Sequence, residues 1–116
     1  MSEIITGRHL DKLIKRRGQV VMTLRHLANE QKQVEQNTDW LDQAAYDSRV
    51  NLLDRLSDWY ATEISQIDKA IERIESHGYG FCFACHEAID EARLEIAPET
   101  EFCSSCQELR DGLRCL

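Results

Sequence analysis

The sequence predicts a mainly α-helical fold, in which a long antiparallel two-helix coiled-coil hairpin precedes a small cysteine-rich module and a short C-terminal helix. Three observations support this prediction. The 116 residues include only one proline and five glycines, so few turns interrupt the chain. Apolar residues in the first two thirds recur at steps of three and four, the period of one helix face. Four of the five cysteines stand in two close pairs near the C-terminus.

Two long helices are predicted, the first over about residues 8–36 and the second over about residues 41–77. The apolar positions of each follow one heptad seam. In the first helix these positions are Leu10, Leu13, Val20, Leu24, Leu27 and Val34. In the second they are Leu53, Leu56, Tyr60, Ile67, Ala70 and Ile74. The second helix is expected to end at His77–Gly78, where a glycine can take the left-handed capping conformation.

The segment 37–42 between the helices is short and polar, and contains residue types that cap helix N-termini. Such a short connection makes its two helices antiparallel neighbours. Their charges are opposite, since residues 8–33 carry seven basic against two acidic side chains and residues 39–76 carry four against nine. The sequence therefore predicts a hairpin over residues 1–76, with its tip at 37–42, and a second module over residues 77–116.

Composition excludes several classes of function. The formal net charge of −7 argues against a bare phosphate-binding surface, so sequence-specific DNA binding is not expected. No apolar run approaches the ~18 residues of a membrane span, and the N-terminus does not resemble a secretory signal, so a cytoplasmic location is expected. We find no glycine-rich phosphate loop, nucleophile elbow or histidine-containing triad pattern, and we expect no enzyme.

The cysteines give the most specific signal. Cys82 and Cys85 form one CxxC pair, and Cys103 and Cys106 form another, with 17 residues between the pairs. Four thiolates at this spacing are typical of one structural zinc ion, whose closed tetrahedral shell leaves no position for catalysis. A disulfide pair is disfavoured by a reducing cytosol, and the spacing is unusual for an iron–sulfur cluster.

Other residues near the cysteines have simpler interpretations. His77 and His86 are alternative ligands, but four cysteines already complete the shell. Cys115 is expected to be a free thiol beyond a short helix over residues 106–113. The aromatic and aliphatic residues of the module are expected to form a small core around the metal, with an exposed contact patch as the alternative. These residues are Tyr79, Phe81, Phe83, Leu94, Ile96 and Phe102.

The module resembles the DksA/TraR zinc-finger family. The resemblance rests on Gly78-Tyr79-Gly80-Phe81-Cys82-Phe83-Ala84-Cys85, on Arg93-Leu94-Glu95-Ile96-Ala97-Pro98, and on Phe102-Cys103-Ser104-Ser105-Cys106. Upstream, Asp39-Trp40-Leu41-Asp42-Gln43-Ala44 is similar to the tip motif Asp-x-x-Asp-x-Ala of that family. The distance from this motif to the first cysteine pair also matches, so the resemblance covers roughly residues 8–112.

The resemblance implies a transcription regulator that binds bacterial RNA polymerase as a monomer and inserts its hairpin into the secondary channel. Asp39, Asp42 and Ala44 would then lie near the polymerase active site and alter promoter complexes. From the residues alone, Asp39 and Asp42 are as well explained as helix caps. Two other functions stay open: a zinc-binding interaction module that dimerises through its hairpin, and a thiol redox sensor.

The chain also departs from the family pattern. Only 38 residues precede the tip motif, so the sequence looks like a short form without the full N-terminal segment. Some members bind guanosine tetraphosphate through basic residues, and the matching positions here hold Gln66, Ala97 and Gln107. None of these three can supply a positive charge to a phosphate, so we expect no use of that alarmone at the finger-side site.

Overall fold

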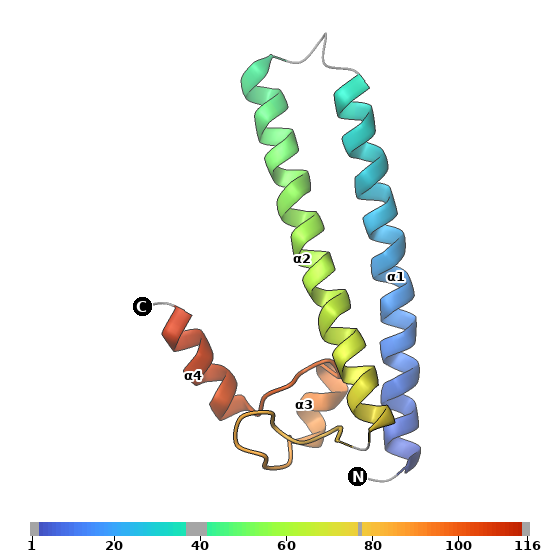
Figure 1. The fold of residues 1–116 in the computed structure, drawn as a ribbon, viewed down its shortest axis with the longest axis vertical. Coiled ribbons are helices and arrows are strands. Elements are labelled where there is room, and N and C mark those ends of the chain that lie inside the picture. Colours follow the sequence, from blue (N-terminus) through green and yellow to red (C-terminus); the bar gives the residue numbers. More distant parts are fainter. Residues whose placement is uncertain (1–2, 37–41, 77, 115–116) are drawn as a thin grey trace. The chain divides into compact units, whose positions relative to one another are not determined.

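The computed structural model describes residues 3–36, 42–76 and 78–114. Four helices follow in chain order: α1 (Glu3–Gln36), α2 (Gln43–Glu75), α3 (Glu91–Ile96) and α4 (Ser104–Arg114) (Figure 1). No β-strand occurs in the described ranges, and Phe81 and Ala88 form one isolated antiparallel bridge. The mainly helical fold is therefore confirmed. None of the helices formed by these residues is both long enough and apolar enough to cross a membrane.

The long helices differ from the predicted bounds at their ends. α1 begins at Glu3 rather than near Arg8, because residues 3–7 contain no proline to prevent the helix from extending beyond its apolar seam. α2 ends at Glu75. The N–H of Gly78 donates a 2.8 Å hydrogen bond to the carbonyl oxygen of Arg73. This bond satisfies one of the free carbonyl groups at the helix end.

Packing divides the chain into two compact units. The finger unit consists of residues 1–15 and 66–116, and the hairpin unit consists of residues 16–65. Each unit therefore contains part of α1 and part of α2. The predicted division of the chain at residues 76–77 stays a prediction.

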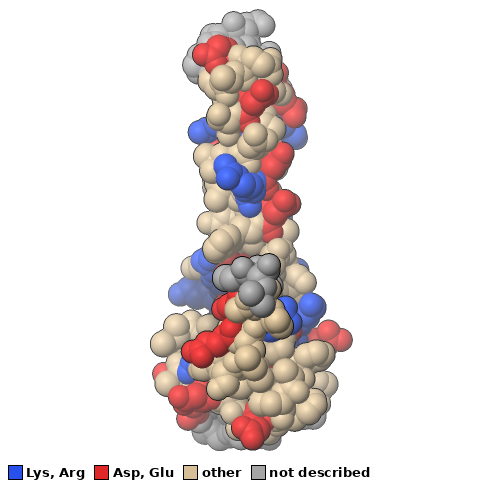
Figure 2. All heavy atoms as spheres, turned by 90° about the vertical axis from the view of Figure 1, so that its left-hand side faces the viewer, with Lys and Arg blue, Asp and Glu red and all other residues tan. Residues whose placement is uncertain are grey.

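The hairpin unit holds its two helical segments together through a narrow apolar seam. Val20 and Leu27 of α1 and Leu53 of α2 are buried, as the heptad pattern predicts. Antiparallel pairing is visible in its polar contacts, because Arg16 binds Glu63 at one end while Glu30 binds Arg49 nearer the other. Basic and acidic side chains lie next to one another on the face of this unit in Figure 2.

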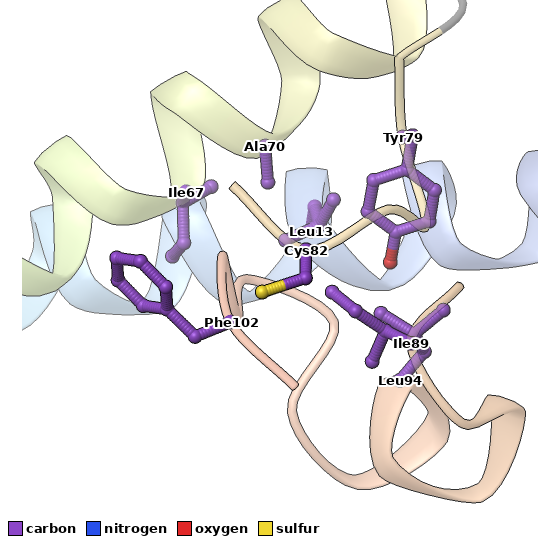
Figure 3. Packing of buried hydrophobic residues seen from close by; sticks show 8 residues of the cluster. All are labelled: Leu13, Ile67, Ala70, Tyr79, Cys82, Ile89, Leu94 and Phe102. Atoms are coloured by element: carbon purple, nitrogen blue, oxygen red, sulfur yellow. The ribbon is translucent and has the colours of Figure 1, made fainter. Parts of the chain in front are cut away.

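The finger unit has a larger core, in which α1 and α2 pack against the cysteine-containing segment. Figure 3 shows Leu13 from α1 and Ile67 and Ala70 from α2 meeting the side chains that follow α2. Those side chains are Tyr79, Cys82, Ile89, Leu94 and Phe102. Ionic contacts border this core, including Arg73 with Glu101 at 3.8 Å and Arg8 with Glu95 at 3.7 Å.

Half of the core predicted around the metal is wrong. Tyr79, Leu94 and Phe102 are buried, whereas Phe81, Phe83 and Ile96 are exposed. Phe81 and Phe83 flank the buried Cys82, with Phe81 in an isolated bridge and Phe83 at the start of a turn, and neither side chain points into the core. Ile96 follows Leu94 by two helical positions, a rotation of roughly 200°, so burial of one exposes the other.

Candidate metal centre and hairpin end

The four cysteines predicted as metal ligands converge in the finger unit. Their Sγ atoms all lie within 4.8 Å of one another, and those of Cys85 and Cys103 are 3.8 Å apart. Cys82 is buried and Cys85 is exposed, while Cys103 and Cys106 are half-buried. The cluster therefore lies at the edge of the core, with one ligand anchored inside it.

Backbone hydrogen bonds shape the first cysteine pair. The N–H of Cys82 donates to the carbonyl oxygen of Glu87 at 2.8 Å, and the N–H of His86 donates to that of Cys82 at 2.9 Å. The turn requires a positive φ of 64° at His86, a conformation that glycine adopts more readily than histidine. The tight turn brings the sulfurs of Cys82 and Cys85 to the same side.

The second pair is positioned by the start of α4 and by a backbone hydrogen bond from the segment of the first pair. Cys103 immediately precedes α4, and Cys106 lies in the first turn of that helix. The carbonyl oxygen of Cys103 accepts a 2.9 Å hydrogen bond from the N–H of Gln107. The N–H of Phe83 donates to the carbonyl oxygen of Glu101 at 2.8 Å, which ties the two cysteine segments together.

The thiols influence one another's protonation. Burial raises the pKa of Cys82, but hydrogen bonds to its sulfur from the backbone of Cys85, Cys103 and Ala84 outweigh burial and lower the pKa to about 6. Hydrogen bonding with the side chain of Cys103 is the main cause that raises the pKa of Cys106 to about 12. Without a positive charge between them, the four thiols therefore do not all ionise near neutral pH.

A zinc ion fits this donor set. With Zn–S distances of about 2.3 Å, a tetrahedral site has sulfur atoms about 3.8 Å apart, which agrees with the 3.8 Å between Cys85 and Cys103. Four thiolates around one cation leave no open position for a substrate. The protein is therefore a four-cysteine zinc-finger protein with one structural zinc. His86 is exposed and lies outside the cluster, while His77 and Cys115 fall outside the described residues.

The residues of the predicted tip motif belong to the hairpin unit. Asp39 lies outside the described residues. Asp42 is exposed and caps α2, because its Oδ1 accepts a 2.7 Å hydrogen bond from the N–H of Ala45. Its carbonyl oxygen accepts a further bond from the N–H of Tyr46 at 3.0 Å. Ala44 is also exposed, in the first turn of α2. The capping role of Asp42 is thus present, and a second role would use the same exposed carboxylate.

Sequence reasoning missed a buried histidine in the finger unit. His9 is 2% exposed, and both of its ring nitrogens lack a hydrogen-bond partner in the described part of the chain. Its ring lies 5.8 Å from that of Tyr79, whose hydroxyl donates to the carbonyl oxygen of Pro98. His9 lies one turn before Leu13 and next to the heptad seam, and this position on the same helix face could have indicated its burial.

Comparison with known proteins adds to this geometry. Residues 77–111 match the model of the prokaryotic dksA/traR C4-type zinc finger. An uncharacterized protein of Aquifex aeolicus is 35% identical over 97 residues, which are 84% of this chain and 65% of that protein. The RNA polymerase-binding transcription factor DksA of Caulobacter vibrioides is 36% identical over 86 residues, 74% of this chain and 58% of that one.

Solved structures support the fold. The transcription factor DksA2 from Pseudomonas aeruginosa matches with a TM-score of 0.87 and 23% identity, over 100% of this chain and 90% of that one. An RNA polymerase binding protein from Chlamydia trachomatis matches with a TM-score of 0.61 and 20% identity, over 97% and 95% of the two chains. The chain spans only about three fifths of the length of the curated relatives it matches.

Proposed function

We propose that the chain belongs to the DksA/TraR zinc-finger family and is a transcription regulator that binds bacterial RNA polymerase. The observation that carries this proposal is the four-cysteine finger combined with 36% identity to an RNA polymerase-binding transcription factor. The finger holds the fold and does no chemistry, so the protein acts as a regulator rather than as an enzyme. Its place of action is the cytoplasm, where the polymerase is.

The hairpin acts by entering the secondary channel of the polymerase. A pair of packed helices is about two helix diameters across, roughly 20 Å, and can enter a channel that excludes globular domains. At the start of α2, the side chains of Asp42 and Ala44 are exposed and can be presented to a partner. One copy enters with Asp39, Asp42 and Ala44 leading, and the carboxylates of the two aspartates meet basic groups or the metal-bound active site of the polymerase.

This regulation does not use guanosine tetraphosphate at the finger side. Gln66 is exposed and uncharged, and Ala97 has no polar side-chain atom. The amide nitrogen of Gln107 donates a 3.0 Å hydrogen bond to Asp111 within α4, so an acidic group stands where a phosphate would bind. Tight alarmone binding to the complex of this protein with the polymerase would contradict this part of the proposal.

The test separates the charge of Asp42 from its cap. Asp42→Asn keeps an oxygen that can cap α2 but removes the charge, whereas Asp42→Ala removes both. If the carboxylate acts on the polymerase, Asp42→Asn and Asp39→Asn retain binding to core polymerase but lose the effect on promoter-complex lifetime. Asp58→Asn, at an exposed position of the same helix, is the matched control and should act like the wild type.

Three outcomes of this test are informative. Wild-type protein that neither binds core polymerase nor changes promoter-complex lifetime would refute the proposal. An active Asp42→Asn variant beside an inactive Asp42→Ala variant would assign Asp42 a purely structural role. Loss of activity in the Asp58 control would show that net charge, and not the tip motif, is responsible.

A further inference from the structure

The hairpin unit carries an exposed apolar stripe on α2. Leu52, Leu56 and Trp59 follow one another at steps of four and three, and are 44%, 37% and 72% exposed. Apart from Met22 on α1, they are the exposed large apolar side chains of this unit in the described residues. Single exposed apolar residues are ordinary, but three in register on one helix face form a patch that a partner can cover.

The stripe is distinct from the seam that joins the two helices. Leu56 was expected on that seam, yet it is exposed while Leu53 is 2% exposed. At 100° per residue, the three stripe residues are centred roughly 90° around α2 from Leu53. A partner on the stripe can therefore pack beside the hairpin without displacing α1.

Charged residues of opposite sign flank the two ends of the stripe. Arg49 lies seven residues before Leu56, and Glu63 lies seven residues after it, so both continue the same heptad register. Each is fixed in place by an ion pair with α1, Arg49 with Glu30 at 2.7 Å and Glu63 with Arg16 at 2.6 Å. The order of the charges is reversed between the ends: α2 supplies the positive charge at one end and the negative charge at the other.

When two identical stripes lie antiparallel, the positive end of each meets the negative end of the other. We infer that a second copy of this chain covers the stripe, with the two α2 helices antiparallel and Leu56 near the two-fold axis. Leu52 then faces Trp59 of the second copy, and Arg49 faces Glu63 of the second copy at both ends. A parallel arrangement would instead place Arg49 against Arg49 and Glu63 against Glu63, which like-charge repulsion disfavours.

The contact is small. Three apolar side chains per copy make less than a standard interface, and the flanking ion pairs are partly exposed to solvent. The dimer is therefore weak, and its population depends on the protein concentration. It is a state of the free protein, and a copy that is bound to another partner is not part of it. The inference rests on the hairpin unit alone and does not depend on the proposed function.

Sedimentation equilibrium of the zinc-loaded protein tests the inference, over about 10 μM to 1 mM, the range of weak dimers. The wild type should approach the dimer mass as concentration rises. Leu56→Lys places two positive charges near the two-fold axis and should weaken association at least tenfold. Met22→Lys, the matched change at the exposed apolar position of α1, should associate like the wild type.

Charge reversal supplies a second test that does not depend on the apolar core. Arg49→Glu and Glu63→Arg should each associate more weakly than the wild type, because each creates like charges between antiparallel copies. When the two variants are mixed, opposite charges meet at both ends, and a heterodimer should form. Mixing restores no ion pair within either chain, so a mere folding defect would not be rescued.

Several results would overturn the inference. The wild type could stay monomeric over the whole concentration range, or Leu56→Lys could dimerise like the wild type. The charge variants could each associate like the wild type when alone, or fail to form a heterodimer when mixed. A monomeric wild type whose binding to core polymerase is lost on Leu56→Lys would assign the stripe to the polymerase instead.

Discussion

Replacement of the buried histidine of the finger unit by leucine should stabilise the protein. The ring of His9 is 2% exposed, and neither nitrogen has a partner in the described part of the chain. A buried polar group without a partner costs about 1–3 kcal/mol. The ring contact with Tyr79, at 5.8 Å between centroids, returns about 0.5–1.5 kcal/mol. His9→Leu places an apolar side chain in this space and should raise the free energy of unfolding by about 1 kcal/mol at pH 8.

The gain should be larger in acid. Burial lowers the pKa of His9 from its usual value of 6.5, and Lys12 lowers it further, while Glu95 acts in the opposite direction. Below pH 6.5 the unfolded chain therefore takes up a proton that the folded chain does not hold. The stability of the wild type falls as pH drops through the interval between 6.5 and the lowered pKa.

Urea unfolding of the zinc-loaded protein at pH 8 and pH 6 measures both effects. His26→Leu, at an exposed position of α1, is the control and should leave the pH dependence of the wild type in place. The reasoning is refuted if His9→Leu is less stable than the wild type at both pH values. It is also refuted if His9→Leu loses as much stability on acidification as the wild type, because His9 would then not be the group that titrates.

Three further predictions concern the finger unit. His86→Gly should stabilise the zinc-loaded protein by up to about 1 kcal/mol in urea unfolding, because glycine removes the strain of φ 64°. The control His26→Gly, within α1, should destabilise the protein by a similar amount. Leu13→Ala should cost about 2–5 kcal/mol of unfolding free energy, and Ile14→Ala, 55% exposed, less than about 0.5 kcal/mol. Removal of zinc by a chelator should unfold the finger segment, seen as lost circular dichroism that added zinc restores; an unchanged spectrum would contradict a structural zinc.

Sequence pattern was a good guide wherever a single period or spacing dominates. The buried side chains Leu13, Val20, Leu27 and Leu53 follow the heptad seams, and the paired cysteines meet as their spacing predicts. These features are local repeats whose geometry follows directly from helix pitch and zinc coordination. They required no knowledge of long-range packing.

The remaining features depend on which side of a short segment faces the core. Phe81 and Phe83 are as apolar as Phe102, yet only Phe102 is buried, because the burial of Cys82 turns its two neighbours outward. Leu56 fits the spacing of its seam but lies at the rim, where Leu52 and Trp59 extend it into an exposed stripe. Composition cannot distinguish these alternatives, since the outcome depends on contacts from distant parts of the chain.

Asp42 shows how one residue can satisfy two requirements at once. A cap needs only an oxygen that accepts a hydrogen bond, as the 2.7 Å contact with the N–H of Ala45 shows. Asn or Ser would serve about as well there, so the capping hydrogen bond alone does not select a charge. An action on a basic or metal-containing site needs the negative charge as well. The difference between Asp42→Asn and Asp42→Ala therefore measures the cap, and the difference between the wild type and Asp42→Asn measures what the charge contributes beyond it.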